Sequence, residues 1–258
     1  PDGDTGTNMS MTIGAAVTEL RKSTPATVDQ AASITASALL RGARGNSGVI
    51  LSLLFRGLSK ILKGRDSADA ASFAAAMQEG VSAAYNAVMK PAEGTILTVS
   101  RLAADRAMAA SAEKNSVEYV IEQAISQGEE TLRQTVDMNP VLKKAGVVDA
   151  GGKGLMCLYE GMYKALIGEE VGGNITVSEP KSSSETLMDH ADIMNLGVIE
   201  FAYCTEFFII NINKKTTLAD IEKLREKLMA LGDCVIVIGD LELVKVHVHT
   251  NKPGVALS

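Results

Sequence analysis

The sequence predicts an all-α antiparallel helical barrel or bundle followed by a small α/β domain of βαββ order. Apolar residues recur at three-to-four spacing from Met9 to about Ile167, which is the period of amphipathic helices. A stretch containing Gly, Pro and a run of Ser follows, and beyond it the apolar period becomes two, as in half-buried strands. We therefore expect a helical domain over 1–168, a linker over 169–186 and a small α/β domain, incomplete at its end, over 187–258.

Composition favours closely packed helices and argues against several classes of protein. Hydrophobic residues make up 46% of the 258 residues and charged residues 22%, as in a globular protein with a substantial core. Tryptophan is absent and aromatics reach only 4%, so the core must come from Ala, Leu, Val, Ile and eleven Met. A net charge of −6 without a basic stripe argues against a nucleic-acid partner. No apolar run approaches the ~20 residues that cross a bilayer, so no transmembrane segment is expected.

The cysteines and the first residue bear on the setting of the chain. Cys157, Cys204 and Cys234 have no disulfide-like spacing and no secretory signal precedes them, so we expect reduced thiols in the cytoplasm. Cys157 and Cys234 have apolar neighbours and are expected in the core. The chain begins at Pro1, in the middle of a motif, so a segment upstream of it is expected.

Seven helices are predicted in the first region. Ala is frequent in them, which fits its high helix propensity and the close approach of packed helices. Thr27, Ser67 and Ser116 are expected to act as start signals for the second, fourth and sixth helices. The predicted ranges are Thr12–Lys22, Val28–Leu40, Ser47–Leu62, Ala68–Met89, Ile96–Ala112, Ser116–Val136 and Lys153–Ile167.

The second region reads as a strand, a helix and two strands. Strands are expected over Ala202–Asn213, Cys234–Ile238 and Leu243–Thr250, with a tight turn at Asp240–Leu241. An amphipathic helix over Thr217–Ala230, capped by Thr216, connects the first strand to the second. Pro253 is expected to open another helix.

Two carboxylates one residue apart stand in Pro1–Asp2–Gly3–Asp4, directly before a helix. Side chains at i and i+2 of an extended loop can point to one side, and oxygen ligands held close together suit Mg²⁺. Gly6–Asn8 then lead into the helix, whose free N–H groups and positive dipole end favour a phosphate. A turn with an ordinary N-cap is the competing interpretation. An EF-hand is discounted because Ile13 stands where its bidentate Glu would be.

Three further glycine-rich or acidic loops open helices: Arg41–Gly48, Lys90–Thr95 and Gly146–Gly154. The first lacks the Lys–Ser/Thr ending of a Walker A loop, and no strand precedes it as in a Rossmann fingerprint. Each alone is weak, since a flexible turn between helices has the same composition. Together with the acidic loop they could gather at one end of a bundle and form a nucleotide site.

These motifs carry a resemblance to a known family. PDGDTGTNM, RGARGNSGVILS, KPAEGTILTV and GVVDAGGKGL, in this order, resemble the ATP-binding domain of the fatty acid kinases, which is similar to the ATP-hydrolysing subunit of dihydroxyacetone kinase. YCTEF and VKVHVHTN resemble the middle domain of the same kinases. The resemblance covers nearly the whole chain and implies an antiparallel helical barrel with ATP at its open end.

The resemblance also implies roles for individual residues. Asp2 and Asp4 would be the catalytic residues and would hold a pair of Mg²⁺ ions that bridge the phosphates of ATP. A further metal ligand of the family lies just upstream of this motif, in a stretch that the chain lacks. Phosphate oxygens would meet Thr5, Gly6, Thr7 and Asn8, and also Ser47 and Gly48 through a hydroxyl and an N–H. Thr95 and Ile96 would line the nucleotide pocket, and Asp149, Ala150 and Gly151 would close over the base or ribose.

The implied reaction is transfer of a phosphoryl group to a fatty acid carboxylate, presented by a separate fatty-acid-binding carrier protein, to give an acyl phosphate. A carboxylate is already a nucleophile at neutral pH, so no general base is required, which fits the absence of histidine in residues 1–189. The family proteins are much longer, so this chain is expected to bind ATP but to turn over fatty acid poorly. The alternatives are a non-catalytic nucleotide-binding module and a dihydroxyacetone-kinase-like protein that binds ATP. A homodimer is left open.

The histidines of the second region suggest a zinc site. His247 and His249 are i and i+2 on a predicted strand and therefore face the same side. With Cys204 they could bind Zn²⁺ and leave its fourth position open, either in catalysis or in a module that docks a partner. Solvent-facing polar positions are the competing interpretation, but this Cys and this His pair recur together in the family. Cys234 is the alternative fourth ligand, and His190 is expected at the surface.

Overall fold

The computed structural model describes residues 4–88, 91–169, 200–239, 241 and 243–258. The chain divides into two compact units, residues 1–169 and 170–258, and each is described by itself. Apart from Glu169, the range predicted as a linker lies outside the described residues, as do Asp2 and His190.

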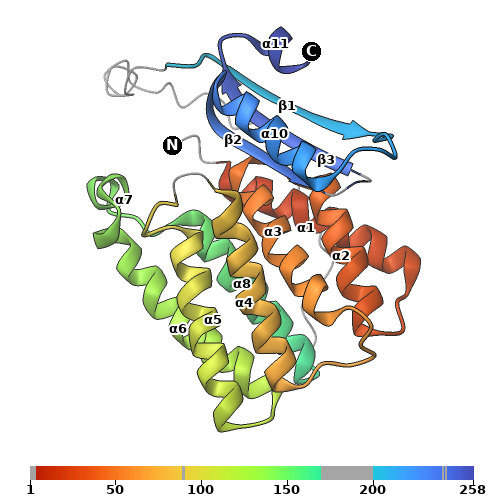
Figure 1. The fold of residues 1–258 in the computed structure, drawn as a ribbon. Helices are drawn as coiled ribbons and strands as arrows, with labels where there is room; N and C mark the ends of the chain where they lie inside the picture. The colour runs from red at the N-terminus through yellow and green to blue at the C-terminus, as the bar shows by residue number, and fades with distance from the viewer. Residues whose placement is uncertain (1–3, 89–90, 170–199, 240, 242) are drawn as a thin grey trace. The chain divides into compact units, whose positions relative to one another are not determined.

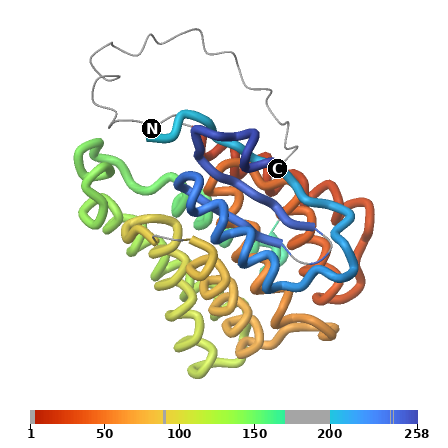
Figure 2. Tube along the Cα trace, turned by 45° about the horizontal axis from the view of Figure 1, so that its top comes forward, coloured from red at the N-terminus to blue at the C-terminus, as the bar shows by residue number. Residues whose placement is uncertain are grey.

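The first unit is a ring of helices, drawn from red to green in Figure 1. Helices that follow one another in the chain pack together from α1 through α6, and α8 packs on both α6 and α1, which closes the ring. Figure 2 shows the same neighbours from a second direction, with the yellow α5 lying along the yellow-green α6. The predicted antiparallel helical barrel is confirmed. The helices are α1 Thr5–Ser23, α2 Val28–Gly42, α3 Gly45–Leu62, α4 Ala70–Ala87, α5 Ile96–Glu113, α6 Val117–Met138, α7 Pro140–Ala145 and α8 Ala150–Leu166.

Small residues let neighbouring helices of the barrel approach closely. Gly57 of α3 and Gly80 of α4 face each other, and a Cβ on either glycine would collide with the backbone of the opposite helix. Ala74, Ala103 and Ala107 are completely buried between helices. Dense contact of this kind explains how a chain poor in aromatics fills its core.

The helix start signals were only partly right. Thr27 and Ser116 do cap α2 and α6, because their side chains accept hydrogen bonds from the backbone N–H groups of Gln30 and Tyr119. Ser67 was the wrong choice for α4. Asp69 is the cap, and its carboxylate accepts from the N–H of Ser72 while the Ser72 hydroxyl lies 3.1 Å from the N–H of Asp69. This reciprocal capping box outweighs the start signal two residues earlier. The short helix α7, with Pro140 in its first turn, was not predicted.

Three helices begin earlier than their apolar pattern predicts. α1 begins at Thr5, α3 at Gly45 and α8 at Ala150, so the residues read as loops form the first helical turns. Apolar periodicity appears only where a helix buries a face, whereas the first turns of these helices carry polar residues and glycine. The predicted loops therefore shrink to the few residues before each helix.

The second unit is a three-stranded antiparallel sheet with one crossover helix. β1 is Tyr203–Ile210, α10 is Leu218–Met229, β2 is Gly232–Gly239, β3 is Leu243–Thr250 and α11 is Pro253–Ala256. The strand order is β1-β3-β2, with Cys204 opposite His249 and Glu206 opposite His247. The predicted βαββ order and the helix at Pro253 are confirmed. The cap of α10 is Thr217 rather than Thr216, because the carboxylate of Asp220 accepts hydrogen bonds from the backbone N–H and hydroxyl of Thr217.

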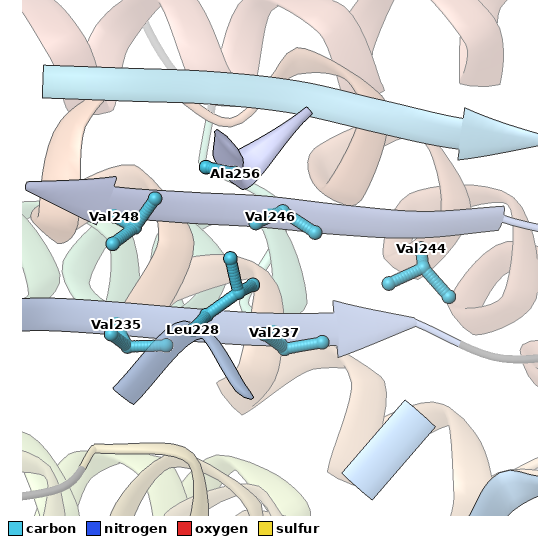
Figure 3. Packing of buried hydrophobic residues seen from close by; sticks show 7 residues of the cluster. All are labelled: Leu228, Val235, Val237, Val244, Val246, Val248 and Ala256. Atoms are coloured by element: carbon cyan, nitrogen blue, oxygen red, sulfur yellow. The ribbon is translucent and has the colours of Figure 1, made fainter. Parts of the chain in front are cut away.

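One face of the sheet forms the core of this unit. Alternate residues of β2 and β3 meet Leu228 of α10 and Ala256 of α11, as Figure 3 shows. Because successive side chains of a strand point to opposite faces, the intervening residues, including His247 and His249, lie on the other face. The core residues from the strands are Val235, Val237, Val244, Val246 and Val248.

Two cysteines are not where the sequence placed them. Cys157 and Cys234 are both exposed, although each has apolar neighbours in the sequence. Cys157 lies on an exposed side of α8, and Cys234 lies in an irregular part of β2 that the period-two pattern does not anticipate. Among the described residues, no helix is long and apolar enough to span a membrane.

Candidate functional site

Four helices begin at the same end of the barrel. The start of α1 lies against the starts of α3 and α8, and the start of α8 lies against that of α5. These are the four helices that open with the sequence motifs, so the fold brings the motifs to one end although they are far apart in the chain. The pairs that show it are Asn8 with Gly45, Met9 with Gly154 and Val99 with Gly152, in each of which a Cβ on the glycine would come within 2.9 Å of the partner side chain.

Asp4 occupies the N-cap position of α1 but does not act as an N-cap. Its carboxylate accepts no hydrogen bond from the first turn; instead its Oδ2 accepts from the side-chain amide of Asn8 at 2.7 Å. The N–H groups of Thr5, Gly6 and Thr7 have no intrahelical acceptor at this position. The exposed carboxylate thus keeps oxygen lone pairs for a cation, while the adjacent helix start offers donors to an anion. An ordinary capping turn does not account for this arrangement.

The start of α3 is fastened to α1 by Thr12. The buried Oγ1 of Thr12 donates to the carbonyl oxygen of Asn8 at 2.7 Å and accepts from the N–H of Arg44 at 3.1 Å. Gly48 packs against the same hydroxyl so closely that a methyl group there would collide with it. The N–H of Gly48 already donates to the carbonyl oxygen of Arg44, so this N–H is not available to a phosphate.

The N–H groups that α3 leaves without an intrahelical acceptor are those of Gly45, Asn46 and Ser47. Gly45 has a φ of +56°, a conformation that glycine adopts without strain. Ser47 is half-buried in the first turn, where its hydroxyl and N–H belong to one anion-binding position. The structure therefore keeps Ser47 as a candidate phosphate contact and gives Gly48 a packing role.

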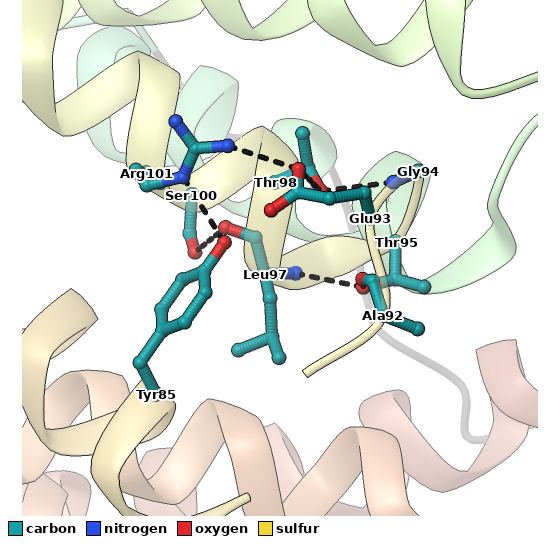
Figure 4. Close-up of polar contacts among 9 residues, drawn as sticks. All are labelled: Tyr85, Ala92, Glu93, Gly94, Thr95, Leu97, Thr98, Ser100 and Arg101. Atoms are coloured by element: carbon teal, nitrogen blue, oxygen red, sulfur yellow. Dashed lines mark hydrogen bonds and ion pairs between the residues drawn. The ribbon is translucent and has the colours of Figure 1, made fainter. Parts of the chain in front are cut away.

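The start of α5 is held by a network of side chains, drawn in Figure 4. Thr95 is the N-cap, and its hydroxyl donates to the carbonyl oxygen of Ala92 at 2.8 Å and lies 3.4 Å from the N–H of Leu97. Glu93 binds both Thr98 and Arg101, through contacts of 2.8 and 2.9 Å. The loop before the helix is thereby tied to the helix itself.

Two more contacts complete this network. The guanidinium of Arg101 donates to the hydroxyl of Tyr85 on α4 at 3.1 Å, a contact that raises the pKa of Arg101. The hydroxyl of Thr98 accepts from the N–H of Gly94, whose φ is +74°. The position of Thr95 at the end of the barrel is therefore fixed from both sides.

Asp149 joins the starts of α8 and α5. As the N-cap of α8 it accepts from the N–H of Gly152 at 2.7 Å, and the N–H groups of Ile96 and Gly151 also donate to its carboxylate. Burial raises the pKa of Asp149, an effect that these backbone hydrogen bonds partly offset. Ile96 and Gly151 are buried at this junction, whereas Ala150 is exposed. The carboxylate of Asp149 is thus engaged with the backbone, so it holds the site together rather than facing outward.

A cavity of about 280 Å³ lies beside the first turns of α1. It is bounded by α1, α3 and α8 and its lining is mostly apolar, so a phosphate would not be stabilised inside it. Gly6 lies at its edge, and the lining is completed by Met9, Ser10, Ile13, Leu51, Gly154, Cys157 and Leu158.

A second group of candidate residues lies on the open face of the sheet in the second unit. The Sγ of Cys204 lies 3.9 Å from both ring nitrogens of His247, and the Nε2 atoms of His247 and His249 are 3.3 Å apart. Burial lowers the pKa of His247, with His249 adding to the effect, so the ring is held neutral. A neutral imidazole pair beside a thiol is a donor set that suits Zn²⁺.

Neighbouring charged groups surround this set. Glu206 forms an ion pair with the buried Lys245 and lies 3.9 Å from Nδ1 of His247. Oδ1 of Asp233 lies 3.2 Å from Nδ1 of His249. Carboxylates beside the outer nitrogen of a metal-binding imidazole fix its orientation and tautomer. The inner nitrogens, both Nε2, are left to face each other.

Comparison with known proteins identifies the family. A family model described as the DAK2 domain matches residues 1–164. The chain belongs to the DAK2 domain family. A second model, the FakA-like middle domain of the fatty acid kinases, matches residues 200–258 of this DAK2 protein. The combination is the FakA-like architecture of fatty acid kinase, and its DAK2 domain supports a kinase-type function in ATP binding.

Curated relatives of this DAK2 protein are known from several bacteria. Protein YloV of Bacillus subtilis is 41% identical over 260 residues, which cover 100% of this chain and 47% of YloV. Uncharacterized proteins of Staphylococcus saprophyticus and Staphylococcus haemolyticus are 43% and 42% identical, each over 98% of this chain and 46% of the relative. The chain thus spans about half the length of the curated relatives that it matches.

The sequence pointed to the motifs but missed the residues that hold them. Thr12, Glu93 and Arg101 contact no ligand candidate in a sequence pattern, because each acts on a loop that only the fold brings near. Asp233 was also missed, although its place beside Cys234 could have signalled a cluster. Apolar periodicity cannot reveal contacts of this kind, since they join polar atoms across helices or strands.

Proposed function

We propose that this chain is the ATP-binding part of a phosphotransferase that phosphorylates a fatty acid carboxylate. The observation that carries the proposal is the convergence of four motif-bearing helix starts at one end of the barrel. Helix starts combine free N–H groups with the positive end of the helix dipole, and several of them together suit a triphosphate. The family to which the chain belongs is consistent with this function.

Asp4, together with Asp2, would hold two Mg²⁺ ions. The donor set fits, because the Asp4 carboxylate is exposed and contacts one amide donor rather than the N–H groups of its own helix. Bound Mg²⁺ neutralises charge on the phosphates. Donors from this chain would then fix the phosphates: the N–H groups at Thr5–Thr7, and Ser47 with its neighbouring N–H groups.

The remaining candidates would shape the nucleotide pocket. Thr95, held by the Glu93–Arg101 network, would border the base or ribose, and the exposed Ala150 would lie on the opposite side. Ile96, Gly151 and Asp149 would support this pocket from beneath, since Asp149 links the two backbones. Asn8 would orient Asp4 through its amide.

In the proposed reaction, a carboxylate oxygen of the fatty acid attacks the γ-phosphorus of ATP. The bond between that phosphorus and the β,γ-bridging oxygen breaks, ADP leaves, and an acyl phosphate forms. The carboxylate attacks without losing a proton, so the site needs to position and neutralise charge rather than to supply a base. A fatty-acid-binding carrier protein would present the substrate, and the match to the FakA-like middle domain favours this acceptor over dihydroxyacetone.

The second unit would contribute a zinc site. Cys204, His247 and His249 supply one sulfur and two nitrogen donors, and the neutral state of His247 suits coordination. The site lies on a sheet of the domain that follows the kinase domain, so its expected role is to stabilise or dock that domain. We propose it as a feature of the same protein, separate from phosphoryl transfer.

Isothermal calorimetry of ATP binding, with and without Mg²⁺, tests the kinase proposal. The wild type should bind ATP only with Mg²⁺, and Asp2→Ala and Asp4→Ala should abolish the binding heat. Asp137→Ala, which removes an exposed carboxylate of α6, is the matched control and should bind normally. Trapping an acyl phosphate with hydroxylamine, in the presence of a fatty acid carrier, separates a kinase from a non-catalytic nucleotide-binding module.

Failure of the wild type to bind Mg²⁺–ATP, both as this chain and when extended upstream, would exclude the proposal. Binding that survives the loss of both carboxylates would exclude their role as metal ligands. Phosphorylation of dihydroxyacetone but not of a fatty acid would favour the second candidate function.

A further inference from the structure

The residue Cys234 lies in a β-bulge that its sequence does not announce. Asp233 pairs with His249 and Ile236 pairs with His247, so three steps along β2 correspond to two steps along β3. The backbone of Cys234 has a φ of +48°, in the left-handed region. This region is unfavourable for residues with a Cβ, apart from the tolerance of Asn and Asp.

Packing does not explain a cysteine at this position. Its side chain is exposed, whereas the four residues that follow it in β2 are buried. Glycine or asparagine would satisfy the left-handed backbone at lower cost. Strained non-glycine residues of this kind persist where the surroundings require them, and they cluster at binding sites. The thiol is therefore the feature of this residue that needs an explanation.

The bulge brings two consecutive side chains of β2 to the same histidine. Donor atoms of Asp233, Cys234 and His249 lie within 4.8 Å of one another, and so do those of Cys204, His247 and His249. In a regular strand only one of Asp233 and Cys234 would face His249, because neighbouring side chains alternate between faces. The two groups of donors thus share one imidazole.

We propose that Cys234 is the fourth protein ligand of the zinc site whose other ligands are Cys204, His247 and His249. The inference rests on the zinc site proposed above. Asp233, with Oδ1 at 3.2 Å from Nδ1 of His249, is the positioning residue that leaves Nε2 of that ring for the metal. A Cys₂His₂ set closes the coordination sphere, which makes the site a structural one with no open position for a substrate.

The test compares Cys234→Gly with the wild-type chain, because glycine removes the thiol and also suits the left-handed backbone. Zinc affinity, measured by competition with a chromophoric chelator, should fall at least about tenfold in the variant. In the metal-free protein, the melting temperature should equal or exceed that of the wild type. Cys157→Ser, which removes another exposed thiol, is the control and should leave zinc affinity unchanged.

Cobalt spectroscopy supplies a readout of the ligand set. Co²⁺ bound to the wild type should show a tetrahedral spectrum with thiolate-to-metal bands, weaker in Cys234→Gly and in Cys204→Ser. If Cys234→Gly keeps the wild-type zinc affinity and cobalt spectrum, Cys234 is not a ligand and the inference fails while the three-residue site stands. If the wild type binds neither metal, the zinc site itself is excluded and the inference with it.

Discussion

Thr12 and Arg44 are joined by a hydrogen bond of 3.1 Å from the backbone N–H of Arg44 to the side-chain oxygen of Thr12. Thr12 is completely buried on α1, and Arg44 is the residue directly before α3. The bond therefore fixes the start of one motif-bearing helix against another. It also satisfies an N–H group that the helix itself cannot, because the N-cap position has no intrahelical acceptor.

Thr12→Val should destabilise the barrel. Valine keeps the shape of threonine but cannot accept the hydrogen bond, so the N–H of Arg44 loses its partner at a cost of about 1–3 kcal/mol. Urea unfolding followed by circular dichroism measures the loss. Thr18→Val, on the exposed side of the same helix, is the control and should change stability by less than about 0.5 kcal/mol. Equal losses in both variants would show that helix propensity, rather than the contact with Arg44, sets the cost.

Gly48→Ala and Gly14→Ala should have opposite effects although both glycines are helical. A methyl group at Gly48 collides with the hydroxyl of Thr12, so repacking should cost about 1–3 kcal/mol. Gly14 has open space around its Cβ position, and alanine should stabilise α1 by about 0.4–1 kcal/mol. Melting temperatures compared at equal concentration test the pair. A stabilising Gly48→Ala would contradict the close contact between α1 and α3.

Asp149→Ala should be more harmful than Asp149→Asn. Alanine removes the cap of α8 and the link to Ile96, and loss of a cap alone costs about 0.5–2 kcal/mol. Asparagine retains a side-chain oxygen and is itself a good N-cap, so it should preserve most of the stability. Denaturant unfolding of the two variants gives the comparison, and similar losses would mean that the carboxylate charge is what matters.

The same residue should leave a signature in the pH dependence of stability. Burial raises the pKa of Asp149 above its ordinary value of 3.8, so the folded chain holds this proton more tightly than the unfolded chain. The contribution of Asp149 to stability is then greatest below pH 3.8 and declines as pH rises through the raised pKa. The stability of the wild type minus that of Asp149→Asn should fall over this range. A difference that rises with pH would reverse the sign.

Asp233→Ala should weaken metal binding without removing a ligand. Loss of the contact to Nδ1 of His249 frees the ring to rotate, and losses of this type are about 10–100-fold in affinity. Asp233→Asn keeps an acceptor and should lose less. Glu226→Gln, which removes an exposed charge of α10, should bind zinc as the wild type does. If all three variants bind alike, Asp233 does not position His249.

The fold could be predicted because its main signals are local and repetitive. Apolar period separated the helical unit from the sheet, and β3 was predicted with its observed bounds because each of its residues is paired or packed. The starts of α1, α3 and α8 were not, since their first turns bury no continuous apolar face. The choice of Ser67 over Asp69 failed because a capping box depends on reciprocal geometry.

The sites were predictable as motifs but not as geometry. The four loops were recognisable from glycine and acidic residues, whereas the engagement of the Gly48 N–H and of the Asp149 carboxylate required the hydrogen bonds. Cys234 was expected in the core because its neighbours are Val and Ile. A bulge shifts the alternation of a strand by one residue, and no residue in this stretch signals it.

The backbone-to-backbone contact of Gly57 with Gly80 decides which seams of the barrel can yield. Two helices locked through their main chains cannot slide without separating, so α3 and α4 must move as one rigid body. At the seam between α1 and α8, the flexible thioether of Met9 faces Gly154 and can adapt its shape. Breathing motions that admit or release a molecule would therefore pass through the seam between α1 and α8, leaving α3 and α4 as the fixed wall.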